Sequence, residues 1–298
     1  MARQIPKIEY GEKLIRDTKV LHLSTQTTSC ILLNGSMKSK AAYDVRGYLD
    51  FENDDSIEYV TVQMPYVVMS NSNYIVNQYN NTLKLTANGS SYTYTLTLGN
   101  YTAQSFKTLL LSVMPTGFGI DYSLVTNRFT FTYTQPFSLN TGSTCDYVIG
   151  FSGTETAALV GATYTLVCSR SYNFLPIPRY IIHCNLLNDG IILGNNSAIG
   201  CSDVLATIPN VSKPNGQLVY ENIASEFVLK SMSFGQLVIT ITDDNNREID
   251  FLGISSYFQI KFNIFRRYLK RPLKFDNLVE YINSVPIPES QPADELDQ

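Results

Sequence analysis

Residues Gln236–Thr242 read QLVITIT and decide the fold class of this chain. Leu237, Ile239 and Ile241 fall on one face of an extended segment, because successive side chains of a strand point to opposite sides. One face is therefore apolar and the other is polar and faces solvent, which is the pattern of a half-buried antiparallel strand. A polar turn at residues 243–247 (DDNNR) follows, so the segment ends where a hairpin turn is expected.

Strands of this kind recur along the chain, and loops of uneven length that are rich in Gly, Asn and Pro separate them. The pattern gives about eight or nine strands, which suits a double-sheet jelly roll or another sandwich. Uneven loops favour the jelly roll, because Greek-key crossings need them. The sequence therefore predicts a mainly β protein with a single jelly-roll β-sandwich, whose strands lie at residues 29–33, 57–64, 164–168, 180–187, 204–208, 217–220, 227–232, 237–242 and 257–264.

The pattern changes between residues 77 and 165, where hairpins flank a helix. Asn88-Gly89 is a strong turn signal between two short strands. The helix that follows is capped by Asn100 or Thr102, and a second hairpin comes after it. The order strand, strand, helix, strand, strand predicts a small α+β (ββαββ) domain that is inserted into the jelly roll.

These predictions divide the chain into five parts. The N-terminal part is expected to be an extended arm, and the C-terminal part a mobile tail that is first basic and then rich in Pro and acidic residues. The parts are the arm at residues 1–24, the jelly roll (first part) at 25–76, the inserted domain at 77–165, the jelly roll (second part) at 166–265, and the tail at 266–298.

Composition narrows the classes of function. A net charge of -4 argues against a nucleic-acid footprint over the whole surface. No segment approaches the roughly 18 apolar residues of a membrane span. The N-terminus shows no apolar core of a secretory signal, so the five cysteines are predicted to be free, buried thiols rather than disulfides.

Few residues are candidates for catalysis or metal binding. Cys168, His183 and Cys184 are soft ligands, but they lack the paired spacing and the fourth ligand of a zinc site. His22 and His183 are expected to be structural or exposed. The acidic loop at residues 243–248 lacks the Gly of a calcium loop, so a hairpin turn is the better interpretation. We therefore predict no catalytic, cofactor-binding or metal-binding residues and no enzyme activity, although a carboxylate pair for sugar hydrolysis stays open because such pairs meet only in the fold.

Five segments occur in a recognisable order along the chain: residues 94–102 (YTLTLGNYT), 127–131 (NRFTF), 148–151 (VIGF), 204–209 (VLATIP) and 237–253 (LVITIT to IDFLG). Taken in this order, they resemble minor capsid proteins of virophages and related polinton-like viruses. The resemblance extends over about residues 25–265. The length of the chain and its few candidate catalytic residues are similar to those of the penton proteins of Mavirus- and Sputnik-type virophages.

The resemblance implies a structural capsid protein that forms the pentameric vertex capsomer, or penton, of an icosahedral shell. It implies a homopentamer in contact with trimers of a double jelly-roll major capsid protein, located in the virion and assembled in the cytoplasm of the infected host cell. The inserted domain is expected to face outward, where it is a candidate for binding a host-surface receptor, while the termini face the shell or its interior.

Other functions stay open at this point. The basic stretch at residues 266–274 is a candidate for weak contact with the genome or shell, with a solvated element as the alternative. A receptor- or glycan-binding β-sandwich, such as a viral fibre head or a lectin-like module, is the main alternative for the whole chain. A sandwich-type glycosidase or a cupin-like metal enzyme is the third, and only two histidines make the cupin version poor.

Overall fold

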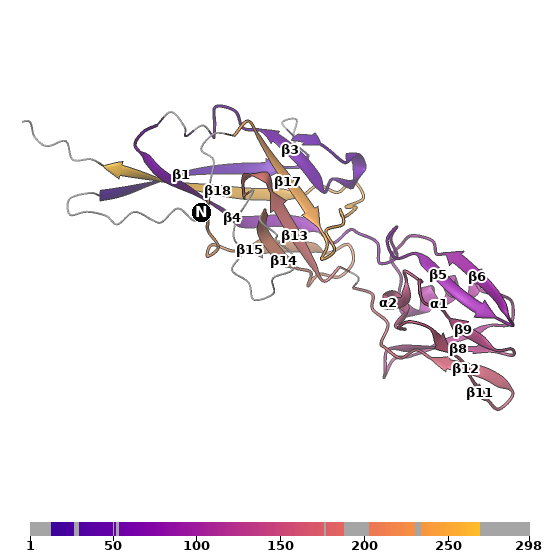
Figure 1. Ribbon diagram of the computed structural model, residues 1–298. Coiled ribbons are helices and arrows are strands. Elements are labelled where there is room, and N and C mark those ends of the chain that lie inside the picture. Colours follow the sequence, from indigo (N-terminus) through magenta and orange to yellow (C-terminus); the bar gives the residue numbers. More distant parts are fainter. Residues whose placement is uncertain are drawn as a thin grey trace, which may run out of the picture.

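The chain folds into two lobes, each with its own hydrophobic core (Figure 1). The computed structural model describes residues 13–26, 30–49, 51, 54–175, 177–187, 203–229 and 234–268. We call the larger lobe the jelly-roll lobe and the other the smaller lobe. None of the helices in these ranges is long and apolar enough to cross a membrane.

Two antiparallel sheets form the jelly-roll lobe. The first sheet has the order β1-β18-β4-β15, with the short strand β16 also pairing with β4. Its strands are Lys13–Ser24 (β1), Tyr257–Tyr268 (β18), Ile57–Ser70 (β4), Gln217–Glu221 (β15) and Phe227–Val228 (β16). The second sheet has the order β14-β13-β17-β3-β2. Its strands are Val204–Pro209 (β14), Arg179–Cys184 (β13), Gln236–Thr242 (β17), Lys40–Asp44 (β3) and Cys30–Leu32 (β2).

The pairing of these strands is nested. Taken along the chain, the main strands are β1, β3, β4, β13, β14, β15, β17 and β18. The first pairs with the last, β3 with β17, β4 with β15, and β13 with β14. A long hairpin that is folded over on itself produces this order, which is that of a jelly roll. The predicted single jelly roll is confirmed.

Alternating side chains of the two sheets fill the core between them. Leu237, Ile239 and Ile241 of β17 are buried, as the alternation predicts, and they belong to the same core as Phe258 and Phe262 of β18. Burying each such side chain stabilises the fold by about 1.5–3 kcal/mol. The sandwich therefore depends on many modest contributions from both inner faces.

The smaller lobe leaves the jelly roll after β4 and returns to it at β13. It holds two sheets of four strands, with the orders β10-β9-β5-β6 and β11-β12-β8-β7. Their strands are Thr82–Ala87 (β5), Ser90–Thr95 (β6), Gly119–Ser123 (β7), Arg128–Tyr133 (β8), Phe137–Leu139 (β9), Glu155–Thr156 (β10), Ala158–Val160 (β11) and Thr163–Val167 (β12). Two helices accompany them, Ala103–Val113 (α1) and Asp146–Ile149 (α2), and a 3-10 turn at Gly35–Met37 and another at Asn185–Leu187 lie in the jelly-roll lobe.

Helix α1 begins as the sequence predicts. The side chain of Thr102 accepts a hydrogen bond from the backbone N–H of Ser105, and Oγ of Ser105 accepts one from the backbone N–H of Thr102, which completes a capping box. Phe106 and Leu110 of this helix are buried in the smaller core. The predicted strand, strand, helix, strand, strand order is present as β5, β6, α1, β7 and β8, and the lobe continues beyond it with β9, α2 and β10 to β12.

One predicted strand belongs to the other lobe. The sequence places a jelly-roll strand at residues 164–168, but Thr163–Val167 is β12, which pairs with β8 and β11 in the smaller lobe. Alternation shows that a strand is half-buried and does not show which sheet buries it. The boundaries of the inserted domain at residues 77–165 stay a prediction, and the smaller core draws on residues from Ile75 to Cys168.

The predicted N-terminal arm is wrong for residues 13–24. This segment is β1, which pairs with β18 over its 12 residues. Its charged residues hide the strand pattern because they meet partners across the sheet, as Asp17 does with Arg266 (2.8 Å). The start of the predicted tail is wrong for the same reason, since β18 runs on to Tyr268. Residues 1–12 and 269–298, which hold the rest of the arm and tail, lie outside the described residues.

Two separate cores predict two unfolding transitions. Phe262 is fully buried in the jelly-roll core and Phe131 in the smaller core. Truncating either to Ala is expected to lower the stability of its own lobe by about 3–5 kcal/mol, since a cavity remains. Differential scanning calorimetry of Phe262→Ala and Phe131→Ala measures the stability of each lobe. The control is Val211→Ala at an exposed position, which should change the stability by no more than about 0.5 kcal/mol. Equal shifts of both transitions in either variant would contradict the independence of the lobes.

Candidate functional site at the junction of the two lobes

A buried polar network closes the end of the jelly roll from which the smaller lobe emerges. The Tyr180 hydroxyl shares its proton between Oδ1 of Asn71 (2.8 Å) and Oδ1 of Asn73 (2.7 Å). Asn210 donates from Nδ2 to Oδ1 of Asn71 (3.2 Å) and to the carbonyl of Ile177 (2.9 Å). Burial raises the pKa of Tyr180, so its hydroxyl keeps its proton. The network thereby fixes the outgoing chain after β4 against the returning chain before β13.

The turn after β17 forms the second part of the junction. The buried carboxylate of Asp243 accepts hydrogen bonds from the backbone N–H groups of Asn245 (2.8 Å) and Arg247 (3.0 Å). It also accepts from Nε of Arg247 (2.8 Å), so its charge is compensated within the turn. Asn246 adopts a φ of 57°, a left-handed conformation that Asn tolerates. This is the hairpin turn that the Asp and Asn content predicts, and Arg247 occupies the carboxylate that a calcium ion would need.

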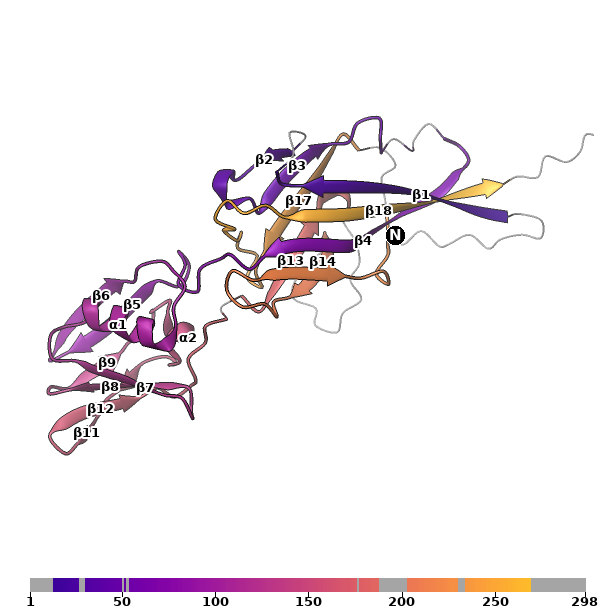
Figure 2. The same ribbon diagram turned by 180° about the vertical axis from the view of Figure 1, so that it is seen from behind.

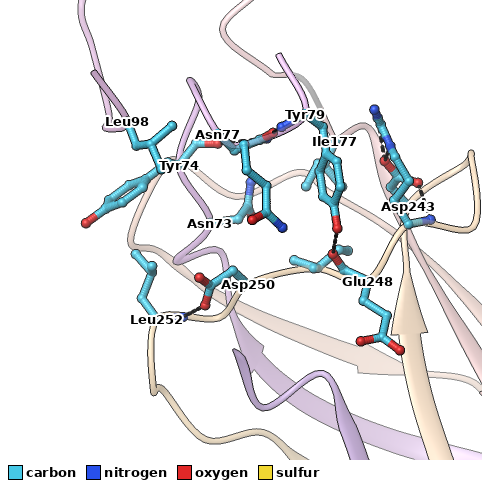
Figure 3. A pocket seen from close by; sticks show the side chains of 13 residues that line it. Asn73, Tyr74, Asn77, Tyr79, Leu98, Ile177, Asp243, Glu248, Asp250 and Leu252 are labelled. Atoms are coloured by element: carbon cyan, nitrogen blue, oxygen red, sulfur yellow. Dashed lines mark hydrogen bonds and ion pairs between the residues drawn. The ribbon is translucent and has the colours of Figure 1, made fainter. Parts of the chain in front are cut away.

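One aromatic side chain ties the turn after β17 to the outgoing chain. The guanidinium of Arg247 lies over the ring of Tyr79, 4.8 Å from its centroid, and the Tyr79 hydroxyl donates to the carbonyl of Glu248 (3.2 Å; Figure 3). Tyr79 lies in the segment that leads into the smaller lobe, so it ties that segment to the jelly-roll turn. A cation–π contact of this kind contributes about 0.5–2 kcal/mol. We call Tyr79, Arg247 and Asp243 the latch.

The latch separates two cavities at the junction. The one in Figure 3 has a volume of about 70 Å³ and is lined by amide and tyrosine side chains of the outgoing chain, with Asp250 and Leu252 on the other side. The other has a volume of about 310 Å³ and extends to Thr144 and Tyr147 of the smaller lobe. Its acidic groups are paired, Asp243 with Arg247 and Asp244 with Arg179. The larger cavity is therefore polar and balanced in charge, which suits a neutral ligand better than an ion.

The structure separates the three residues weighed for zinc. His183 and Cys184 are neighbours on β13, so their side chains point to opposite faces of the sheet, and Cys168 lies in the smaller core. Burial raises the pKa of the Cys168 and Cys184 thiols to about 12, so both stay protonated at neutral pH. Within the described ranges, no three His, Cys, Asp or Glu side chains come close enough to hold a metal ion.

His183 instead takes part in a relay that sequence reasoning does not find. Its Nδ1 lies 3.0 Å from Oδ1 of Asp203, and its Nε2 lies 2.8 Å from the hydroxyl of Thr242. Hydroxyl, imidazole and carboxylate stand in the order of a hydrolase triad. However, Thr242 is only 5% exposed and sits within the sheet between its partner Ile181 and its bridge to Glu248. This burial argues against attack of the hydroxyl on a substrate carbonyl, so we interpret the relay as a structural contact that links β13 and β17 to the residue before β14.

The other sequence candidates lie away from the junction. His22 contacts the hydroxyl of Tyr257 through Nδ1 (2.5 Å), across the pair β1 and β18. Arg266, the first residue of the basic stretch, pairs with Asp17 and Asp54, and Arg267 pairs with Glu58 (3.1 Å). Hydrogen bonds from Ser56 and then Arg266 lower the pKa of Asp54 to about 2. Two charges of the stretch are thus neutralised inside the sheet, while Lys270, Arg271 and Lys274 lie outside the described residues.

The latch predicts graded loosening of the junction. Tyr79→Phe keeps the ring under Arg247 and loses the hydrogen bond to Glu248, whereas Tyr79→Ala loses both. We expect hydrogen–deuterium exchange at residues 243–248 to rise slightly in the first variant and by about tenfold in the second, with both unfolding transitions of the lobes retained. Small-angle scattering should show a wider range of dimensions for Tyr79→Ala. Unchanged exchange in Tyr79→Ala would show that the latch does not hold the turn.

Comparisons with known proteins find similarity of overall shape among solved structures. No protein-family profile matches the chain, and no curated protein matches it. Among solved structures, the crystal structure of selenomethionine-labelled mavirus penton protein aligns at 11% identity with a TM-score of 0.45, covering 83% of this chain and 99% of that one. That protein is of the kind named by the sequence resemblance. The superposition is loose, so the case for a function rests on the strand order and surfaces of the chain itself.

Proposed function

We propose that this chain is a structural capsid protein that occupies the vertices of an icosahedral virus shell. In finer detail, it acts as a homopentameric penton that contacts trimers of a double jelly-roll major capsid protein. One observation carries the proposal: the chain has a single jelly roll with a second lobe at one end, while β1 begins and β18 ends at the other.

The register of the first sheet establishes this polarity. Ser70 ends β4 at the junction, and β18 runs antiparallel to β4, so Tyr268 lies beyond Ile57 at the far end. Lys13 pairs with Tyr268 and lies there too. Figures 1 and 2 show the smaller lobe and these two strand ends at opposite ends of the molecule. A subunit with this polarity would present the smaller lobe outside a shell and the Lys13 and Tyr268 ends of β1 and β18 inside it.

The proposed mechanism is geometric. A ring subunit needs two different side surfaces that meet head to tail until the rotation closes. The long antiparallel ladders of β1, β18 and β4 make the jelly-roll lobe a stiff wedge, and its task is to fill a fivefold opening in the shell. Such a task requires no cofactor and no reacting group. The proposed location is the virion, and the sequence resemblance implies assembly in the cytoplasm of the host cell.

A second function, recognition of a host-surface glycan, is favoured by the larger cavity of the junction. Tyr147 is half exposed there, and the side chain of Asn245 lies on the facing turn. A sugar ring offers C–H groups to an aromatic face and hydroxyls to an amide, and the paired charges of the cavity favour a neutral sugar. In a penton this role would belong to the outward end, so it is compatible with the first proposal.

The vertex role predicts a pentamer. Light scattering across a concentration series should give five times the chain mass of 33.4 kDa, and electron micrographs of the same fractions should show fivefold rings. If the chain is monomeric alone, rings are expected when it is mixed with the major capsid protein, at the vertices of the shells that form. A stable trimer, or shells whose vertices exclude the chain, would overturn the vertex role.

If the larger cavity binds a glycan, truncating a side chain that lines it should weaken glycan binding selectively. An array of neutral and sialylated glycans should show binding to neutral members, which Tyr147→Ala weakens by about tenfold, since a stacked aromatic ring contributes about 1 kcal/mol or more. Tyr92→Ala is the matched control, because Tyr92 is also an exposed tyrosine of the smaller lobe but lies on β6. Binding to sialylated glycans alone, or equal loss in both variants, would contradict a site in this cavity.

A further inference from the structure

An apolar stripe runs along one edge of the jelly-roll lobe. Val219, Ile223 and Val228 are between 55% and 82% exposed. Val219 lies beside Val68 and Val228 beside Thr61, on the same edge of β4. Ile223 lies between them, since its carbonyl accepts a hydrogen bond from Nε2 of Gln63 (3.3 Å). At about 3.3 Å per residue of β4, the three side chains span roughly 23 Å along this edge.

Carboxylates accompany the stripe, and no cation of the described ranges pairs with them. Glu221 and Glu226 come from the same stretch of chain as Val219, Ile223 and Val228. Oε1 of Glu226 accepts hydrogen bonds from Nδ2 of Asn263 (2.7 Å) and from the Thr61 hydroxyl, so its position is fixed while its charge stays uncompensated. The stripe is therefore an apolar line with a negative border.

The opposite side of the jelly roll has the complementary composition. Figure 1 shows β1 and β3 along the upper side of this lobe and β14 and β15 along the lower side, and the view from behind agrees (Figure 2). On the β1 side, Ile31, Leu33 and Tyr48 are between 41% and 58% exposed. We call these three, together with Lys19 and Lys38, the cationic flank.

The two lysines of the cationic flank have neutral partners. Nζ of Lys19 donates to the carbonyl of Tyr48 (2.9 Å) and lies over the Tyr48 ring. Nζ of Lys38 donates to the hydroxyl of Ser255 (3.0 Å). Neither has a carboxylate partner in the described part of the chain, so each charge is free to meet one from outside.

We propose that the apolar stripe of one copy docks on the cationic flank of the next copy. This inference rests on the proposed ring and names the two surfaces that close it. A head-to-tail ring requires different patches on opposite sides of one chain, and these two patches match in kind: apolar side chains face apolar side chains, and carboxylates face lysines. The apolar line supplies the affinity, while the charges set the register and the rate of association.

Two variants and their mixture test the docking. The stripe variant carries Val219→Asp and Ile223→Asp, and the flank variant carries Ile31→Asp and Leu33→Asp; all four positions are exposed, so folding is expected to persist. Each variant alone should be monomeric. An equimolar mixture should give a one-to-one dimer and nothing larger, because the intact flank of one variant meets the intact stripe of the other. The control, Leu124→Asp with Val125→Asp in the smaller lobe, should form rings as the unchanged chain does.

The outcomes separate this inference from the proposed function. Rings in either variant alone would overturn the docking and leave the vertex role standing, as would a mixture without a dimer. If the unchanged chain forms rings only with the major capsid protein, the readout becomes the fraction of shell vertices that the chain occupies. This fraction should be lower for each variant by about tenfold or more. An unchanged chain that is absent from vertices would overturn the vertex role and the docking together.

Discussion

The nested pairing of strands is the constraint on which the rest of the molecule depends. Because β1 pairs with β18 and each inner strand pairs with its counterpart, the chain crosses between the sheets only at their ends. The connection from β4 to β13 is one of these crossings, so a whole lobe inserted there interrupts no ladder. Loop-closure entropy grows slowly with length, by about 0.6 kcal/mol per doubling, so a long insertion at such a point costs little stability. The inserted lobe can therefore carry a second function without weakening the sheets of the sandwich.

Polar groups, rather than apolar ones, hold the insertion in place. The proton of Tyr180 and the amides of Asn71 and Asn210 join both crossing segments in a buried region, where an unmade hydrogen bond costs about 1–3 kcal/mol. Apolar contact alone tolerates sliding, whereas directional bonds between fixed partners do not. The latch of Tyr79 and Arg247 adds a partly exposed contact outside this network, so the junction has a rigid base and a weaker outer tie.

Sequence reasoning succeeds where burial is alternating and fails where partners are distant. The QLVITIT segment of β17 and an N-cap at Asn100 or Thr102 can be recognised from the local sequence, so the sandwich and α1 are predictable. By contrast, β3 (KAAYD) carries small and charged residues, and β1 compensates its charges across the sheet, so neither shows an apolar face. The relay of His183 with Asp203 and Thr242, and the latch at the junction, arise from residues far apart in the chain. Only the fold brings them together, and no spacing rule signals them.

The surfaces proposed for assembly and for recognition lie on different parts of the same scaffold. The apolar stripe and the cationic flank lie on the two sides of the sheets, whereas the smaller lobe and the cavities lie at one end, across the buried network. The stripe and the flank share no residue with the lining of either cavity, so the proposed ring contacts and a ligand at the junction would not occupy the same side chains. Substitutions among the cavity residues of the smaller lobe are therefore expected to leave the proposed ring contacts unchanged. Under the proposed vertex role, the displayed lobe could then change in sequence while the nested strands of the jelly roll stay the same.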